Sequence, residues 1–254
     1  MTGKNNKQPI TLERALNTRD LGGYITADGR KTTDVFLRGD SLEILSARDK
    51  DTLLDLGVRT VIDLRNNDEI LRTPSIFVDC SKMKYYNIPI LPEDSQEKFI
   101  RQSGYAFLMG DLYISILEKS RGAFCKVFRI LAEADGKVLY HCSSGKDRTG
   151  VVSALLLKLV NIDDQAVIED YCLTEVLMEE KLSIMKAEAK RMEEYPDDFL
   201  DEVMSAKAHT MAKFLEHLEN NWNGAEAYLR AIGLCDDEIT RLKVKMTEDE
   251  EKYE

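Results

Sequence analysis

A ten-residue segment in the middle of the chain, HCSSGKDRTG at residues 141–150, limits the possible folds more than any other feature. An apolar run precedes it and a helix-forming stretch follows it. The five residues between Cys142 and Arg148 can curl so that successive backbone N–H groups point inward at the N-terminus of that helix. Such a nest binds an oxyanion such as phosphate, and the guanidinium of Arg148 can close it with two parallel hydrogen bonds. The segment therefore predicts a strand, a phosphate-binding loop and a helix in direct succession.

The loop also offers a nucleophile. Inward N–H dipoles, a helix N-terminus and a neighbouring guanidinium all favour the thiolate, which is the reactive form of cysteine. We therefore expect Cys142 to attack phosphorus and to form a phosphocysteine intermediate. The hydroxyl of Thr149 is placed to donate to the sulfur, and Asp147, which is already in the loop, can protonate the departing oxygen.

The other residues of the segment are expected to shape or line the site. His141 precedes the nucleophile on the strand, so it is expected to organise the loop backbone rather than to transfer protons. The nucleotide-binding pattern G-x-x-x-x-G-K-[ST] is excluded, because Tyr140 stands where it requires glycine and Asp147 where it requires serine or threonine. The residues expected to bind substrate are Ser143, Ser144, Gly145, Lys146, Thr149 and Gly150.

The segment resembles the signature of the protein tyrosine phosphatase superfamily, and its Lys146-Asp147 pair is similar to that of the atypical bacterial tyrosine and lipid phosphatases. The resemblance implies a protein tyrosine phosphatase-like fold and hydrolysis of phosphotyrosine, often of phosphoserine or phosphothreonine, and of phosphoinositides. It also implies that Cys142 is the nucleophile, Arg148 a phosphate ligand and Asp147 the general acid. Further stretches that resemble this family are NTRDLGGY (17–24), LRGDSL (37–42), VIDLR (61–65) and NGAEAYLRAIGL (223–234).

The residues leave two questions open: which carboxylate is the general acid, and what Lys146 binds. The general acid could instead be Asp94, in the sequence LPEDS, or Asp111, although each also fits an ordinary solvated carboxylate. The resemblance places Asp147 first. Lys146 could bind a second phosphate on an inositol ring, or it could lie solvated along the rim of the loop.

Three functions fit these residues: a phosphatase for phosphotyrosine proteins with dual or broad specificity, a phosphoinositide or inositol polyphosphate phosphatase, and a non-catalytic phosphate-binding module. The third has no need of the Cys142 thiol. The expected partners are a phosphorylated protein or a phosphoinositide, with inorganic phosphate at the active site. The chemistry requires no metal and no cofactor, and His209 and His217 have no metal-ligand partners at helical spacing.

Composition indicates the size and the setting of the domain. With 254 residues, 43% of them hydrophobic, the chain can bury one α/β core, so a single catalytic domain is expected. A net charge of −11 argues against nucleic acid as a partner. No run approaches the ~18 apolar residues of a membrane span, and the N-terminus lacks a secretory signal as written.

The chain has five cysteines, an odd number, which favours a reducing compartment. We therefore expect a cytoplasmic protein, or a secreted one if a signal peptide was removed. The cysteines other than the nucleophile are expected to be small buried hydrophobic residues. They are Cys80, Cys125, Cys172 and Cys235.

Strand and helix patterns alternate along the chain, which predicts an α/β fold with a mostly parallel central sheet and helices on both faces. The site is then expected beyond the carboxyl ends of the strands. There, Asp63 with Arg65, and Arg19 with Asp20, could form ion pairs that hold the loop from behind. The expected strands are 58–64, 84–90 and 136–141, the expected helices 46–56, 102–120, 123–134 and 148–159, and a small hairpin is expected at 24–31.

An additional helical region spans about residues 163–221. Apolar residues recur there at helical spacing, and Pro196 divides the region into two pieces. A helical hairpin packed on the core is favoured, and the alternative, which the resembling family can possess, is a movable lid over the loop. The acidic tail, residues 247–254, is expected to be disordered. The apolar residues at helical spacing are Met178, Leu182, Met185, Ala189 and Met192.

Overall fold

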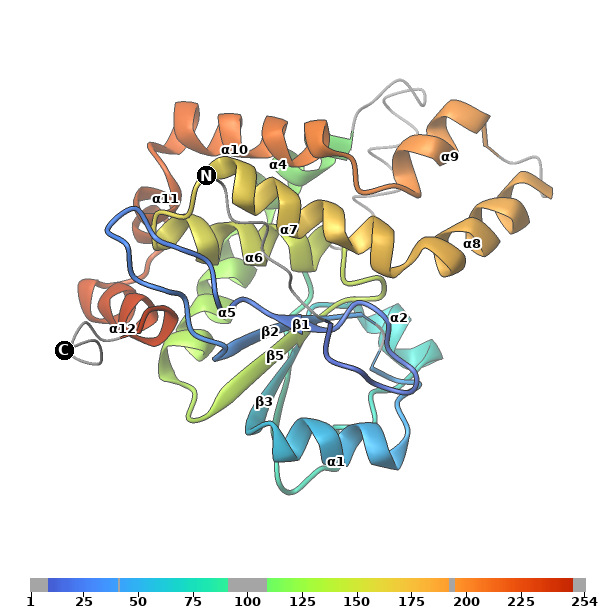
Figure 1. Cartoon of the computed structure of the whole chain (residues 1–254), viewed down its shortest axis with the longest axis horizontal. Coiled ribbons are helices and arrows are strands. Elements are labelled where there is room, and N and C mark those ends of the chain that lie inside the picture. The colour runs from blue at the N-terminus through green and yellow to red at the C-terminus, as the bar shows by residue number, and fades with distance from the viewer. Residues whose placement is uncertain (1–8, 41, 91–108, 192–194, 249–254) are drawn as a thin grey trace.

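The structure, a computed structural model, describes residues 9–40, 42–90, 109–191 and 195–248. In these parts of the chain, one five-stranded sheet has the strand order β1-β2-β5-β3-β4 (Figure 1). All neighbouring strands are parallel except β1 and β2, which are antiparallel. The mostly parallel sheet predicted from the sequence is confirmed. The strands are β1 (Arg19–Asp20), β2 (Phe36–Gly39), β3 (Val58–Asp63), β4 (Lys84–Asn87) and β5 (Lys137–His141).

Helices cover both faces of this sheet, with α1 below it and most of the others above it in Figure 1. Helix α1 (Ala47–Asp55) begins at a capping box formed by Ser46 and Asp49, and the chain leaves it through Gly57, whose φ is +90°. The remaining helices are α2 (Asn67–Arg72), α4 (Met109–Lys119), α5 (Arg121–Glu133), α6 (Asp147–Leu159), α7 (Asp164–Leu177), α8 (Glu179–Arg191), α9 (Asp197–Val203), α10 (Ala208–Trp222), α11 (Ala225–Ala231) and α12 (Asp236–Met246).

The central strand β5 separates two apolar cores. Val138 and Tyr140 belong to the larger core, whereas Leu139 between them belongs to the smaller one, which also contains Leu53 of α1. Because both faces are covered, the strand is one continuous buried run in the sequence. Its last residue, His141, pairs in register with the last residues of β2 and β3, so the segment that follows it begins at the carboxyl edge of three parallel strands.

Most predicted elements are confirmed to within about two residues at each end. The hairpin at 24–31 closes through a bridge between Ile25 and Lys31. Strand β4 ends at Asn87, two residues before Pro89, whereas the sequence predicts a strand to residue 90. Proline lacks the N–H that a ladder requires. The helix predicted at 102–120 is α4 from Met109 onward, and residues 102–108 lie outside the described residues.

The helical region at 163–221 differs from the predicted hairpin, because it forms four helices, α7 to α10. Helices α7 and α10 pack against each other over the core, while α8 and α9 pack together at one end of the molecule (Figure 1). Pro196 lies between α8 and α9, as predicted, and it is the N-cap residue of α9, a position at which the missing N–H of proline costs no helical hydrogen bond. Met192 lies outside the described residues. The movable lid stays a prediction.

Two smaller predictions are wrong. The predicted disordered tail starts too early, because Thr247 forms a bridge with Thr32 and the backbone N–H of Glu248 donates to the carbonyl of Lys31 at 2.9 Å. Residues 249–254 lie outside the described residues. Cys80 and Cys125 are buried as predicted, but Cys172 is only partly buried and Cys235 is exposed at the start of α12.

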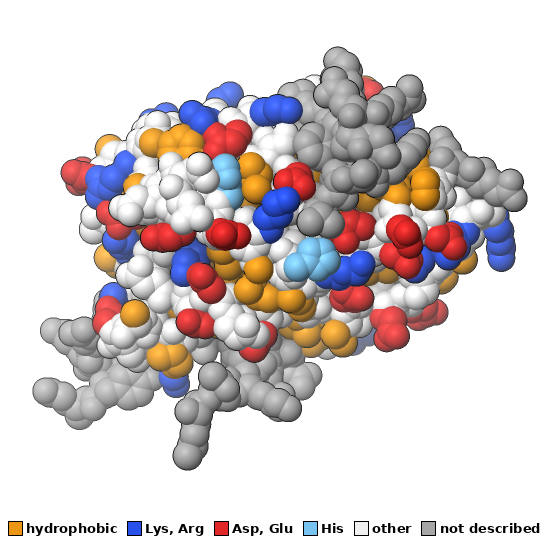
Figure 2. Space-filling model, turned by 90° about the horizontal axis from the view of Figure 1, so that it is seen from above, with side chains coloured by type: hydrophobic (Ala, Val, Ile, Leu, Met, Phe, Trp, Pro, Cys, Tyr) orange, Lys and Arg blue, Asp and Glu red, His pale blue; other side chains and the backbone are white. Residues whose placement is uncertain are grey.

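The face seen in Figure 2 carries acidic and basic side chains interspersed with one another. Among the side chains that this view draws in colour, neither sign of charge forms a separate patch. Within the described ranges, no helix is both long and apolar enough to cross a membrane.

Candidate active site

The loop between β5 and α6 is held from behind by side chains of the N-terminal part of the chain. Asn17 Nδ2 donates to the carbonyl of Ser144 at 2.9 Å, and Arg38 Nη2 donates to the carbonyl of Gly145 at 2.8 Å. The C=O and N–H of a trans peptide unit point in opposite directions. Engaging these two carbonyls on the outside therefore turns the N–H groups of Gly145 and Lys146 toward the inside of the loop.

Gly145 is required by the same geometry. Its φ is +67°, and a Cβ built on it would lie 2.6 Å from the carbonyl oxygen of Gly39 on β2. Only a residue without a side chain allows this approach of two backbones. Glycine is thus needed at position 145 because β2 lies against the loop there, which the sequence alone does not show.

Arg148 is fixed by a carboxylate that the sequence does not predict. Nη1 and Nη2 of Arg148 lie 2.6 and 2.8 Å from the two oxygens of Glu69, and Ser143 Oγ donates to the same carboxylate at 2.5 Å. Burial alone would raise the pKa of Glu69, but the hydrogen bonds and charge of Arg148 outweigh it and hold the pKa at about 2. Glu69 lies in the first turn of α2, just beyond the carboxyl end of β3.

Cys142, the predicted nucleophile, is buried with its neighbours at the base of the loop. Cys142 is 1% exposed, and His141 and Thr149 are fully buried. Nδ1 of His141 lies 3.2 Å from the carbonyl of Cys142, and Nε2 lies 3.4 Å from Asp63 Oδ2. Burial lowers the pKa of His141 despite the opposing charge of Asp63, so the ring is neutral at pH 7. The hydroxyl of Thr149 has no hydrogen-bond partner among the described residues.

Asp147 opens helix α6 with its side chain partly exposed. The hydroxyl of Tyr113 donates to Asp147 Oδ1 at 2.7 Å, and the ammonium of Lys146 lies 3.4 Å from the same oxygen. Of the two rival acids, Asp94 lies outside the described residues. Asp111 forms an ion pair with Lys213 at 2.6 Å between α4 and α10, which is the position of an ordinary helix-surface carboxylate.

Lys146 is not a solvated residue on the rim, which is one of the alternatives that the sequence leaves open. Its residue is 3% exposed, and its ammonium donates to the carbonyl of Val203 and, at 3.1 Å, to that of Ser205. Val203 is the last residue of α9, and Ser205 lies in the connection between α9 and α10. Two of the three N–H donors of this ammonium are thus already engaged by protein carbonyls, with Asp147 Oδ1 3.4 Å away.

A buried ion-pair cluster lies behind the loop, centred on Asp170 of α7. Its two oxygens accept from Arg19 Nε at 3.1 Å and from Arg38 Nη1 at 2.5 Å, and Tyr24 donates to it at 2.9 Å. Arg19 therefore pairs with Asp170 and not with Asp20, which instead accepts from the N–H of Gly22. The sequence prediction is wrong for this pair, because a partner 151 residues away leaves no local pattern.

The other ion pair predicted at the strand ends is confirmed. Arg65 Nη2 lies 2.8 Å from Asp63 Oδ2, and both side chains are at most 1% exposed. Tyr85 of β4 also donates to Asp63, at 2.9 Å. This cluster anchors the carboxyl end of β3 beside the His141 ring.

The Asp170 cluster leads to a prediction about stability. Asp170→Asn leaves the guanidinium groups of Arg19 and Arg38 buried without their counter-ion, so we expect the free energy of unfolding to fall by about 3 to 5 kcal/mol. Urea unfolding measures this. Asp164→Asn in the same helix is the control, because it removes an exposed pair with Lys158 and should cost less than about 1 kcal/mol. Equal losses in the two variants would contradict a structural role for the cluster.

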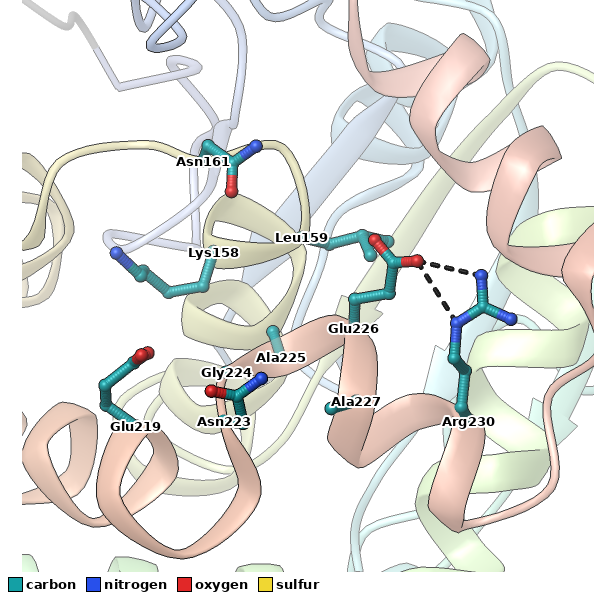
Figure 3. Close-up of a pocket in the computed structure, with 10 residues that line it drawn as sticks. All are labelled: Lys158, Leu159, Asn161, Glu219, Asn223, Gly224, Ala225, Glu226, Ala227 and Arg230. Carbon is teal, nitrogen blue, oxygen red and sulfur yellow. Dashed lines mark hydrogen bonds and ion pairs between the residues drawn. The ribbon is translucent and has the colours of Figure 1, made fainter.

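A pocket of about 490 Å³ lies elsewhere, at the C-terminal end of α6 and the junction of α10 and α11 (Figure 3). Its wall includes the ion pair of Glu226 and Arg230, at 2.8 Å. Lys158, also in the wall, is engaged by Asp164 and by the carbonyl of Ile162. None of the catalytic candidates lines it, so we place the site at the loop and not in this pocket.

Comparison with known proteins identifies a family whose matched region includes the loop at residues 141–150. The model of the family described as "Tyrosine phosphatase family" matches residues 10–248. A tyrosine-protein phosphatase of Nostoc commune is 31% identical over 218 residues, which are 84% of this chain and 74% of that protein. The triple specificity protein phosphatase PtpB of Mycobacterium tuberculosis is 25% identical over 271 residues, covering 91% of this chain and 96% of that protein. Among solved structures, TpbA of P. aeruginosa is 19% identical, with 54% of this chain and 68% of that chain covered and a TM-score of 0.31.

Proposed function

The chain belongs to the tyrosine phosphatase family, and from this we propose that it hydrolyses phosphotyrosine in proteins, with dual or broad specificity, through a phosphocysteine intermediate. The observation that carries the proposal is the arrangement around Cys142. The thiol is buried at the start of a loop whose carbonyls are held outward, and Arg148 is fixed across the loop by Glu69. This is an anion site with a nucleophile at its base.

In the first step, the loop N–H groups and Arg148 bind the phosphoryl oxygens, and the Cys142 thiolate attacks phosphorus in line with the leaving oxygen. A sulfur–phosphorus bond forms as the phosphorus–oxygen bond of the ester breaks. The electron pair of that bond goes to the leaving oxygen, which takes a proton from Asp147. Glu69 uses two of the five guanidinium donors, so Arg148 can hold Glu69 and a phosphoryl group together.

In the second step, water attacks the phosphocysteine and gives its proton to the carboxylate of Asp147. The sulfur–phosphorus bond breaks and inorganic phosphate leaves. The hydroxyl of Thr149, buried and without a partner among the described residues, donates to the departing sulfur. His141 supports the loop through the carbonyl of Cys142 and transfers no proton, since its ring is buried and neutral.

The proposed acid is tested by the leaving group. Asp147→Asn should lower kcat/KM for an alkyl phosphate, whose leaving group needs a proton, on the order of 10²-fold or more. The loss for p-nitrophenyl phosphate should be much smaller, because that leaving group departs as an anion. Steady-state kinetics with both substrates measure the difference. An equal loss on the two substrates would count against Asp147 as the acid.

The second candidate, a phosphoinositide or inositol polyphosphate phosphatase, depends on Lys146 as a ligand for a further phosphate. Because the carbonyls of Val203 and Ser205 already bind its ammonium, a phosphoprotein is the favoured substrate over a phosphoinositide. Broad specificity is supported by the relative whose name calls it a triple specificity phosphatase. A non-catalytic module is disfavoured, since phosphate binding alone has no use for Cys142.

Parallel assays separate these functions. Phosphate release is measured from a phosphotyrosine peptide, a phosphoserine peptide and a panel of phosphoinositides, under reducing conditions and with Cys142→Ser as the blank. Turnover of the phosphotyrosine peptide at the highest kcat/KM supports the proposal. A preference for a phosphoinositide would replace it with the second candidate, and failure to turn over any phosphomonoester would remove both.

A further inference from the structure

Two buried tyrosines from different helices connect to Asp147. Tyr113 lies on α4 and Tyr171 on α7, and both are at most 1% exposed. Their hydroxyl oxygens are 2.8 Å apart, and that of Tyr113 is 2.7 Å from Asp147 Oδ1. Their rings meet edge to face with centroids 5.9 Å apart. The three groups form one hydrogen-bonded chain that reaches the loop from outside it.

The chain has a fixed direction. Burial and then the charge of Asp147 raise the pKa of Tyr113 and of Tyr171 well above the usual range, so each hydroxyl keeps its single hydrogen. When Tyr113 donates that hydrogen to Asp147, its oxygen is left as an acceptor, and Tyr171 supplies the donor. Every donor in the chain then points toward Oδ1 of the carboxyl group.

The two oxygens of Asp147 are thereby made unequal. Oδ1 receives the Tyr113 hydroxyl and has the Lys146 ammonium 3.4 Å away. Oδ2 makes no hydrogen bond to any of the described residues. A carboxylic acid whose one oxygen is already accepting carries its proton on the other. The contacts of Oδ1 thus select Oδ2 as the oxygen that can give a proton to a leaving group.

We propose that Tyr113, supported by Tyr171, is a positioning residue that holds Asp147 with its transferable proton on Oδ2. The inference rests on the proposed function, because it assigns these tyrosines to the acid of that mechanism. In the transfer, the Oδ2–H bond breaks, its electron pair stays on the carboxylate, and the leaving oxygen gains the proton. The new negative charge is shared with Oδ1, so the bond from Tyr113 becomes charge-assisted as the transition state forms.

The test compares two substrates within one variant. Tyr113→Phe keeps the ring and removes the hydroxyl. For wild type and variant, kcat/KM is measured on phenyl phosphate, which has a poor leaving group, and on 2,4-dinitrophenyl phosphate, which has a good one. The ratio of the two values is independent of how much of the protein is active, so partial misfolding does not change it. We expect the ratio of kcat/KM on phenyl phosphate to kcat/KM on 2,4-dinitrophenyl phosphate to fall roughly tenfold for Tyr113→Phe. For Tyr171→Phe we expect it to fall roughly threefold.

A matched control loses a buried tyrosine hydroxyl without touching Asp147. Tyr140 on β5 is fully buried, and its hydroxyl lies 2.8 Å from Ser153 Oγ. Tyr140→Phe should leave the substrate ratio unchanged. If it shifts the ratio as much as Tyr113→Phe does, the effect is general to the core and the proposal is overturned.

A double-mutant cycle separates this inference from the proposed function. In the Asp147→Asn background, Tyr113→Phe should change the ratio no further, because it acts only through that carboxyl group. The same tenfold change in both backgrounds would overturn the positioning role. So would an unchanged ratio for Tyr113→Phe when Asp147→Asn alters it. An unchanged ratio for Asp147→Asn itself would remove Asp147 as the acid, and this inference with it, while the nucleophilic role of Cys142 would stand.

Discussion

Cys142→Ser is expected to lower turnover of every phosphomonoester by at least about 10⁴-fold while the protein still folds and binds phosphate. A serine hydroxyl is hardly ionised at neutral pH, so the loop would retain its N–H groups and Arg148 but lose the anionic nucleophile. The residue is 1% exposed, and the oxygen fits where the sulfur was. Initial rates on p-nitrophenyl phosphate measure the loss.

Phosphate binding distinguishes a missing nucleophile from a collapsed site. The melting temperatures of Cys142→Ser and of wild type should both rise when inorganic phosphate is added. The control is Cys125→Ser, a buried cysteine on α5, which should keep full activity. Activity within about tenfold of wild type in Cys142→Ser would contradict covalent catalysis by this residue.

Arg148→Lys should lower kcat/KM on the order of 10³-fold despite keeping the positive charge. Lysine cannot bind Glu69 and a phosphoryl group through parallel donors at once. Glu69 would also lose two hydrogen bonds while it remains partly buried, and its carboxylate would then repel the incoming dianion. Steady-state kinetics on p-nitrophenyl phosphate measure the change, and the inhibition constant for inorganic phosphate reports the binding component.

The control for this variant is another arginine with two bonds to a glutamate. Arg230 donates through Nε and Nη2 to Glu226 on the surface of α11, so Arg230→Lys should leave kcat/KM unchanged. A similar loss in both variants would mean that the change acts on folding and not on the site. A loss below about tenfold for Arg148→Lys would show that charge alone suffices.

What the sequence predicts well is local. The buried run of β5, the loop and the start of α6 follow one another in the chain. Their residue pattern therefore predicts a strand, an anion-binding turn and a helix without any distant contact. Adjacent parallel strands end at one edge of a sheet, and the loop lies at that edge, where the sequence also predicts the site. The confirmed sheet and its helices therefore needed no knowledge of distant contacts.

What the sequence does not predict are the partners that lie far along the chain. Glu69, Asp170 and the two tyrosines beside Asp147 look like ordinary helix residues until α2, α4 and α7 are packed around the loop. Lys146 shows the same limit. Its burial depends on where the carbonyls of Val203 and Ser205 lie, and no spacing within the loop carries that information.

Two consecutive residues of helix α7 contact two different side chains that hold the loop. Asp170 accepts from Arg38, which donates to the carbonyl of Gly145. Tyr171 is hydrogen-bonded to Tyr113, which donates to Asp147, the proposed acid. In the proposed mechanism, the catalytic unit therefore includes helix α7 in addition to the strand, the loop and helix α6. Moving residues 141–150 into another protein would transfer the Cys142 thiol and the Arg148 guanidinium without the contacts from Arg38 and Tyr113. A truncation before residue 164 would remove Asp170 and Tyr171, which support those two contacts.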